Sequence, residues 1–171
     1  MKLIAVYEEN DYFGLVFELF SGGNLKEYLR ERGLLTEKKT ALIMSNVLKG
    51  LQYLNSMNIM HRDVKPENIL FRSSQICDKH IVLADFGFAT SNDVTEYIYY
   101  RCGSPGYVAP EILNLKDPNG HYGLSCDLFS VGVTLFFSLT GKMPYCQSSL
   151  QEQRKIYLKY EAYDALSENG F

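Results

Sequence analysis

The sequence has 171 residues, of which 46% are hydrophobic and 22% are charged, and its formal net charge is −3. This length and composition predict one globular domain with a substantial core and exclude a disordered chain. The small net charge gives no general electrostatic reason to bind nucleic acid or acidic membranes, so we expect neither as a partner.

The cysteines are widely spaced and form no Cys-x-x-Cys pair, which predicts reduced thiols in a cytoplasmic or nuclear protein. Glu8 follows closely on the apolar start of the chain, which makes that start too short for a signal peptide. The longest apolar run, from Val131 to Leu139, is too short to span a bilayer. We therefore expect a soluble protein.

The first elements predicted in chain order are a β-hairpin and a short helix. β-Branched and aromatic residues dominate 3–7 and 13–20, and a Glu-Asn-Asp turn signal separates the two runs. A Ser-Gly-Gly break follows, after which Asn24 can cap a helix that runs to about Arg32 and stops at Gly33.

A longer amphipathic helix is predicted next, capped by Thr36 and reaching about Met57. Its apolar residues recur every three to four positions, which is typical of a helix with one buried face. These residues are Ile43, Met44, Val47, Leu51 and Leu54.

The rest of the chain reads as short strands, one long loop and further helices. Short apolar runs at 69–71 and 81–83 predict strands on either side of a polar turn. Residues 88–110 show no sustained period and predict a long loop, which in a compact domain is usually functional. The nearly all-apolar stretch 126–139 predicts a helix buried on most sides, and 150–166 predicts a polar helix.

The chemistry concentrates in the stretch from His61 to Asn68. Asp63 can orient and deprotonate a hydroxyl, and Lys65 can neutralise a phosphoryl group during its transfer. Asn68 offers an amide oxygen of the hard type that Mg²⁺ prefers, and Asp85 adds a second such ligand at the end of a predicted strand.

These residues carry a family resemblance. The stretch from His61 matches His-Arg-Asp-x-Lys-Pro-Glu-Asn at every defined position, and Asp85-Phe86-Gly87 and Ala109-Pro110-Glu111 follow in the same order. The set resembles the catalytic core of the eukaryotic protein kinase family, in its serine/threonine branch. The likeness to calmodulin-dependent kinases within that branch is looser.

The resemblance implies an α+β, protein-kinase-like fold that is present only in part. Residues 1–171 would form a partial kinase domain, in which a hairpin is the remnant of the N-lobe and the C-lobe is mostly helical. Residues 1–20 would hold the N-lobe strands and the hinge, and residues 21–171 would hold a C-lobe that is truncated at its end.

The resemblance also implies the roles of the polar residues and the cofactors ATP and Mg²⁺. Asp63 would accept or orient the substrate hydroxyl, and Lys65 would stabilise the transferred phosphoryl group. Asn68 and Asp85 would hold Mg²⁺. Lysine at position 65 further favours the serine/threonine branch.

Adenine contacts follow from the same comparison. The backbone of Glu18 and Phe20 would bind the adenine edge as the kinase hinge, with Phe17 at the gatekeeper position. Leu25 and Leu70 would sandwich the ring by apolar contact. For both leucines the alternative is an ordinary place in the core.

The implied partner is a protein with a serine or threonine acceptor. Ser104 matches a hydroxyl that bonds the catalytic aspartate and lysine, and Asp127 matches a buried aspartate that braces the His61 loop. Arg62 suggests that the loop 88–110 is phosphorylated between Thr90 and Tyr100, by an activating kinase or by autophosphorylation.

Nothing before Met1 supplies the family's Gly-rich loop or its strand lysine, so the chain alone is expected to be a poor kinase. Glu111 is expected to be buried without its usual arginine partner. Three interpretations remain. They are a serine/threonine kinase that is truncated in this sequence, a catalytically impaired pseudokinase-like binding or scaffold module, and an unstable gene remnant.

Overall fold

The fold is known from a computed structural model, which describes residues 1–10, 12–73, 81–94, 100–116, 120–145 and 149–157. Its helices are α1 (Leu25–Arg32), α2 (Glu37–Ser56), α3 (Pro110–Asn114) and α4 (Cys126–Thr140), with a 3₁₀ turn η1 at Pro66–Asn68. Its strands are β1 (Leu3–Glu9), β2 (Tyr12–Phe17), β3 (Ile59–Met60), β4 (Ile69–Phe71), β5 (Ile81–Leu83) and β6 (Thr90–Ser91). Residues 150–157 are also helical. The α+β, helix-dominated class is confirmed.

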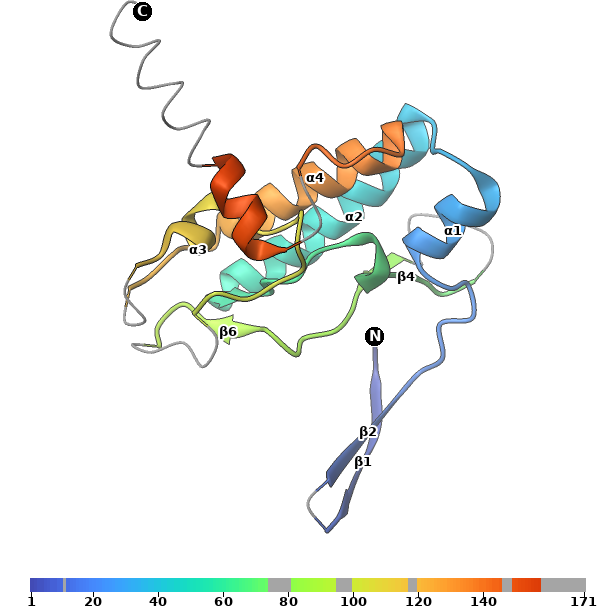
Figure 1. Cartoon of the computed structure of the whole chain (residues 1–171). Helices are drawn as coiled ribbons and strands as arrows, with labels where there is room; N and C mark the ends of the chain where they lie inside the picture. Colours follow the sequence, from blue (N-terminus) through green and yellow to red (C-terminus); the bar gives the residue numbers. More distant parts are fainter. Residues whose placement is uncertain (11, 74–80, 95–99, 117–119, 146–148, 158–171) are drawn as a thin grey trace, which may run out of the picture.

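The hairpin of β1 and β2 projects from the helical part of the molecule (Figure 1). Its strands pair antiparallel, and the ladder is extended where the Glu18 N–H donates to the Lys2 carbonyl at 3.1 Å. Apart from the half-buried Ala5, the described side chains of both strands are exposed. Backbone pairing, and not side-chain burial, therefore holds this hairpin.

Helix α1 has the capping residues that its sequence predicts. The Asn24 side chain accepts from the Glu27 N–H at 2.9 Å, and the Glu27 carboxylate accepts from the Asn24 N–H at 3.1 Å. At the other end, Gly33 adopts a φ of 80° and its N–H donates to the Leu29 carbonyl. The two caps satisfy backbone groups that the ends of a helix leave free.

Helices α2 and α4 lie side by side through the middle of the molecule, with α1 at one end (Figure 1). Thr36 caps α2 as predicted, and Ile43, Met44, Val47 and Leu51 are all buried. They pack in one core cluster with residues of α1, β4, β5 and α4. The amphipathic stripe read from the sequence is confirmed.

A second core cluster lies around α3 and the helix at 150–157. It joins Met60, Ile112, Leu113, Tyr122 and Tyr157, among other residues. The helix at 150–157 thus belongs to the same packed body as the loop that precedes α3. The predicted continuation of this helix to 166 lies outside the described residues.

Short strand pairs position the loops. Strand β4 pairs with β5, and β3 pairs with β6. β6 lies inside the segment 88–110, where the sequence predicted loop only; two hydrogen-bonded residues are too few to produce a recognisable pattern. The expected burial of Glu111 is also wrong, because α3 turns that side chain to the surface. Among the described residues, no helix has the length and apolarity needed to cross a membrane.

Candidate active site

The loop that starts at His61 is held by one carboxylate from α4. Asp127 accepts from the His61 N–H and from the Arg62 N–H, each at 2.8 Å. Its side chain is only 1% exposed. Burial raises the pKa of Asp127, while the two N–H bonds act in the opposite direction by stabilising the anion. The predicted bracing role of Asp127 is confirmed.

His61 joins the two strand ends that bear the candidate catalytic carboxylates. Its Nε2–H donates to the Ala84 carbonyl at 3.1 Å, and its Nδ1 accepts from the Asp63 N–H at 3.3 Å. Burial lowers the pKa of His61, which favours the neutral ring that this pair of bonds requires. The ring of Phe86 packs edge-on against it, with 4.9 Å between centroids.

Asp63 lies at the centre of a network of three polar side chains. One of its oxygens accepts from the Ser104 N–H at 3.0 Å and from the Ser104 hydroxyl at 2.8 Å. The other accepts from Lys65 Nζ at 2.7 Å and from Asn68 Nδ2 at 3.2 Å. Lys65 also donates to the Ser104 hydroxyl at 2.7 Å. The structure thus brings together four residues that the sequence singled out.

The approach of the Ser104 loop to the His61 loop depends on a glycine. Gly103 has a φ of 109°, a backbone conformation that residues other than glycine rarely adopt. A Cβ at this position would lie 2.8 Å from the Arg62 carbonyl oxygen. Gly103 therefore lets Ser104 come within hydrogen-bonding distance of Asp63.

Asn68 and Asp85 lie beside each other at one end of the β4–β5 pair. Asn68 directly precedes β4, and Asp85 follows shortly after β5. The Ala84 N–H donates to the Asn68 carbonyl at 2.8 Å, which places the next residue, Asp85, beside that strand end. Asp85 is exposed, has a φ of 63°, and accepts from the Gly87 N–H at 3.1 Å. An amide oxygen and a carboxylate on adjacent strand ends fit Mg²⁺, which takes few protein ligands and shares phosphate oxygens.

Comparisons with known proteins agree with this geometry. Residues 1–168 match the family described as the protein kinase domain. The chain belongs to the protein kinase family. It is 42% identical over 147 residues to the liver/testis isoform of the phosphorylase b kinase gamma catalytic chain of Mus musculus, which covers 85% of this chain and 35% of that protein.

Two further relatives are also kinases by name. Calcium/calmodulin-dependent protein kinase type 1 of Macrobrachium nipponense is 36% identical over 145 residues, 85% of this chain and 40% of that protein. A probable myosin light chain kinase of Dictyostelium discoideum is 34% identical over 163 residues, 94% of this chain and 41% of that protein. The predicted serine/threonine branch is confirmed, and the chain spans less than half the length of these kinases.

The two leucines predicted to sandwich the adenine ring lie in different surroundings. Leu70 is half-buried beside Asn24, with which it forms an isolated β-bridge. Leu25 has no exposed surface and packs inside the main core, so the adenine contact predicted for it is wrong. The family comparison offered either role for this leucine, and the first turn of α1 directs it inward.

The hinge residues contact the start of the chain and Arg72, the residue directly after β4. The Glu18 carboxylate accepts from the Lys2 N–H at 2.9 Å and from Arg72 at 3.0 Å. Arg72 also lies over the Phe20 ring, 5.4 Å from its centroid. The predicted adenine contacts of Glu18 and Phe20 are backbone contacts and stay predictions.

Arg62 already has partners inside the protein kinase domain. Its Nε donates to the Phe88 carbonyl at 2.6 Å, and another guanidinium nitrogen donates to the Tyr122 hydroxyl at 2.8 Å. Burial raises the pKa of Tyr122, so this hydroxyl stays protonated at neutral pH. Of the loop predicted to be phosphorylated, residues 95–99 lie outside the described residues.

Sequence reasoning missed two residues that support the site, Tyr122 and Gln153. Gln153 is completely buried; its side-chain carbonyl accepts from the Gly106 N–H at 2.7 Å, and its amide donates to the Val108 carbonyl at 3.0 Å. Tyr157, one turn later, donates to the same carbonyl at 3.0 Å. A Gln and a Tyr four residues apart on a polar helix carry no signal for this role.

Proposed function

We propose that this chain provides the catalytic core of a serine/threonine protein kinase, which transfers the γ-phosphoryl group of ATP to serine or threonine hydroxyls of proteins. The observation that carries the proposal is the network of Asp63, Lys65 and Ser104. It holds a buried carboxylate, an ammonium and a hydroxyl within 2.7–2.8 Å of one another.

The network suits phosphoryl transfer because that reaction depends mainly on positioning and on charge stabilisation. The Asp63 carboxylate can orient an incoming hydroxyl and accept its proton, in place of the bond that it now receives from Ser104. The Lys65 ammonium, half-buried beside it, can stabilise charge on the phosphoryl oxygens.

Nucleotide binding would use the adjacent strand ends and the hinge. Asn68 and Asp85 would hold Mg²⁺, which neutralises charge on the phosphates of ATP when it is bound. Asn68 is already oriented for this, because its amide nitrogen donates to the Asp63 carbonyl at 2.8 Å and leaves its oxygen as the acceptor. Leu70 and the backbone of Glu18 and Phe20 would contact the adenine.

The test is transfer of labelled γ-phosphoryl from ATP and Mg²⁺ to peptides with one serine, threonine or tyrosine, using the full-length protein that carries this chain. We expect transfer to serine or threonine, and a loss of at least about 100-fold in Asp63→Asn. Glu31→Gln, which changes an exposed carboxylate on α1, serves as the matched control and should keep full activity.

Urea unfolding of Asp63→Asn separates a catalytic loss from a folding failure. A wild-type protein that unfolds cooperatively, binds ATP and transfers no phosphate would contradict the proposal. That result would favour the alternative of a pseudokinase-like binding module.

Regulation by phosphorylation of the segment 88–110 is a second part of the proposal. The Arg62 guanidinium group lies beside the start of this segment, where its Nε donates to the Phe88 carbonyl. A phosphate on the segment, added by an activating kinase or by autophosphorylation, would compete for Arg62. Phosphopeptide mapping of the active protein tests this, and an unmodified segment in fully active protein would contradict it.

A further inference from the structure

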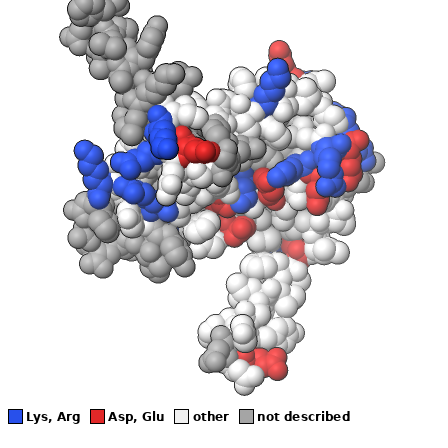
Figure 2. Space-filling view, in the orientation of Figure 1, with Lys and Arg blue, Asp and Glu red and all other residues white. Residues whose placement is uncertain are grey.

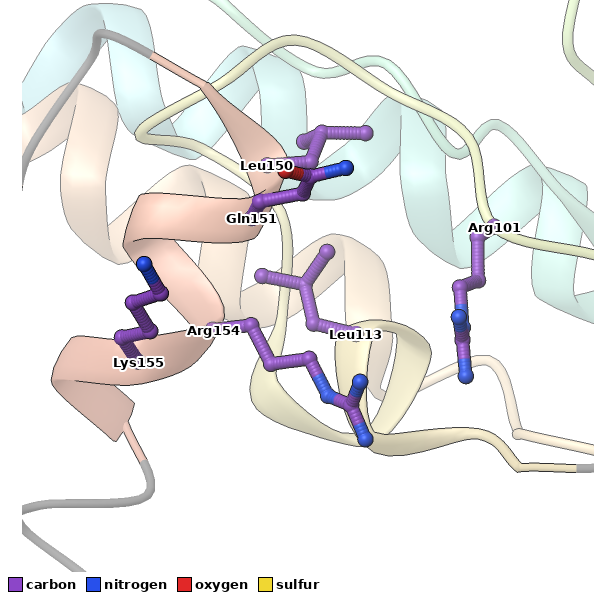
Figure 3. A pocket seen from close by; sticks show the side chains of 6 residues that line it. All are labelled: Arg101, Leu113, Leu150, Gln151, Arg154 and Lys155. Atoms are coloured by element: carbon purple, nitrogen blue, oxygen red, sulfur yellow. The ribbon is translucent and has the colours of Figure 1, made fainter.

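A basic pocket lies beside the loop that carries Ser104, on the side away from the hairpin (Figures 1 and 3). It forms between the segment before Cys102, helix α3 and the helix at 150–157, and its volume is about 370 Å³. The residues that line it are Arg101, Leu113, Leu150, Gln151, Arg154 and Lys155. We refer to it as the basic pocket.

Among the described residues, its lining has three cations and no carboxylate. Arg101 and Arg154 come from different elements and reach toward the pocket on either side of Leu113, with Lys155 beyond Arg154 (Figure 3). Glu111 and Glu152 lie on the same two helices but do not line the pocket. Figure 2 shows lysine and arginine side chains gathered on this face.

No ion pair within the described part of the chain uses any of the three cations of the pocket. Arg101 is nevertheless held in place. Its Nε donates to the Leu115 carbonyl at 2.8 Å, and its guanidinium lies over the Tyr100 ring, 5.4 Å from the centroid. Its positive charge is therefore fixed by neutral partners, and no carboxylate among the described residues pairs with it.

Arg154 carries an unmet hydrogen-bond donor. Its Nε is buried and has no acceptor among the described residues. Buried N–H groups normally have a partner, so an orphan donor at the wall of a basic pocket points to an acceptor supplied from outside. A small turn of the guanidinium would let a phosphate or carboxylate bind through Nε and a terminal nitrogen together.

The basic pocket is close to the place where a substrate hydroxyl would react. Arg101 precedes Ser104 by three residues, a span of at most about 11 Å in an extended chain. Ser104 bonds Asp63 directly. On the other wall, Gln153 precedes Arg154 and bonds Gly106 and Val108 of the same loop. A peptide with its hydroxyl at Asp63 could therefore reach the basic pocket with a residue a few positions away.

We propose that the basic pocket binds a phosphoryl or carboxylate group of the protein substrate, on a residue a few positions from the phosphoacceptor. The inference rests on the proposed kinase function and adds a substrate class to it, namely acidic or already phosphorylated segments. Arg101 and Arg154 would form the bidentate contacts, and Lys155 would add longer-range attraction.

The experiment compares peptides with one serine acceptor, using the full-length protein that carries this chain. One peptide has only neutral neighbours, and the others have glutamate or phosphoserine two to five positions before or after the acceptor. We expect kcat/KM to be about tenfold higher than for the neutral peptide when the acidic residue lies on one side of the acceptor, either before or after it. At the same position, phosphoserine should give a higher kcat/KM than glutamate.

The variants then locate the preference. Arg154→Gln should lower the ratio of acidic to neutral kcat/KM about tenfold, and Lys155→Gln should lower it less. Lys38→Gln removes an exposed cation from α2 and should leave the ratio unchanged. Equal kcat/KM for all peptides, or a preference that survives in Arg154→Gln, would overturn the inference.

A direct binding measurement separates this inference from the kinase function. Fluorescence anisotropy with the labelled phosphoserine peptide should show about tenfold weaker binding to Arg154→Gln than to wild type. If no peptide is phosphorylated, the kinase function fails, and this comparison still decides the pocket. Equal binding of the peptide to wild type and Arg154→Gln would overturn the inference. So would inorganic phosphate that competes for the pocket as strongly as the phosphoserine peptide does.

Discussion

The loop from His61 to Asn68 and the hairpin of β1 and β2 are held by different interactions. In the loop, His61, Asp63 and Asn68 are polar, yet each is less than 7% exposed and each is hydrogen-bonded within the protein. In the hairpin, Tyr12 and Phe13 are apolar or aromatic, yet they are 80% and 70% exposed. Residue polarity and burial are thus opposite to the usual arrangement in both regions.

The difference shows where positional accuracy comes from. The loop is tied to α4 through Asp127 and to the Ser104 segment through Asp63. A polar group that is buried must keep its partners, so these bonds lock the loop in one geometry. The hairpin has backbone pairing alone, which makes an isolated two-stranded element only marginally stable. We expect mutations to affect these two regions very differently.

Asp127→Ala should have the largest effect, because it leaves the buried N–H groups of His61 and Arg62 without an acceptor. Each such group costs about 1–3 kcal/mol, so we expect a loss of about 2–6 kcal/mol in the free energy of unfolding. Urea denaturation measures it. Asp127→Asn keeps one acceptor oxygen and should lose less; equal losses in the two variants would contradict this explanation.

A leucine-to-alanine pair compares the core with the hairpin directly. Leu25 is completely buried, so Leu25→Ala should reduce the free energy of unfolding by about 2–5 kcal/mol. Leu15 in β2 is 55% exposed, and Leu15→Ala should change it by less than about 0.5 kcal/mol. Thermal and urea unfolding of the two variants measure the contrast, and a similar loss in both would show that the hairpin is packed in solution.

Two glycine-to-alanine changes should have opposite signs. At Gly22 an added Cβ would lie 2.2 Å from the Ser73 carbonyl oxygen, so Gly22→Ala should destabilise the protein by about 2 kcal/mol or more. At Gly50, inside α2, an added Cβ meets nothing within 4 Å, and Gly50→Ala should stabilise it by about 0.5–1 kcal/mol. Calorimetry of both variants checks the signs. An unchanged stability in Gly22→Ala would show that the backbone near Ser73 shifts to make room for the added Cβ.

The smallest expected effect is on the pH dependence of stability. The pKa of His61 is lowered in the folded protein, so the unfolded chain binds the proton more readily as the pH falls below about 6.5. The contribution of His61 to stability is therefore present above that pH and is lost as the pH falls from there toward the folded-state pKa.

Urea unfolding at several pH values measures this effect. His61→Gln should flatten the dependence. An identical pH dependence in wild type and His61→Gln would contradict the assignment.

Part of the fold could be predicted because it depends on contacts between neighbours in the chain. The caps of α1 and α2 and the buried stripe of α2 arise from residues three or four positions apart, which the sequence displays directly. The residue types at Asp63, Lys65, Asn68 and Asp85 likewise limited the chemistry, and their family resemblance named it. Leu25 shows the limit of this reasoning, because an apolar residue suits both a ligand contact and the core.

By itself, the sequence determined the local elements, the identity of the polar groups and the family. Only the tertiary structure decided that Tyr122 meets Arg62, 60 positions apart, and that Gln153 meets Gly106, 47 positions apart. It likewise decided that Arg101 and Arg154 line one pocket. The physical reason is that such contacts depend on which elements α3, α4 and the helix at 150–157 pack against, and the spacing of residues within one helix does not specify its partners.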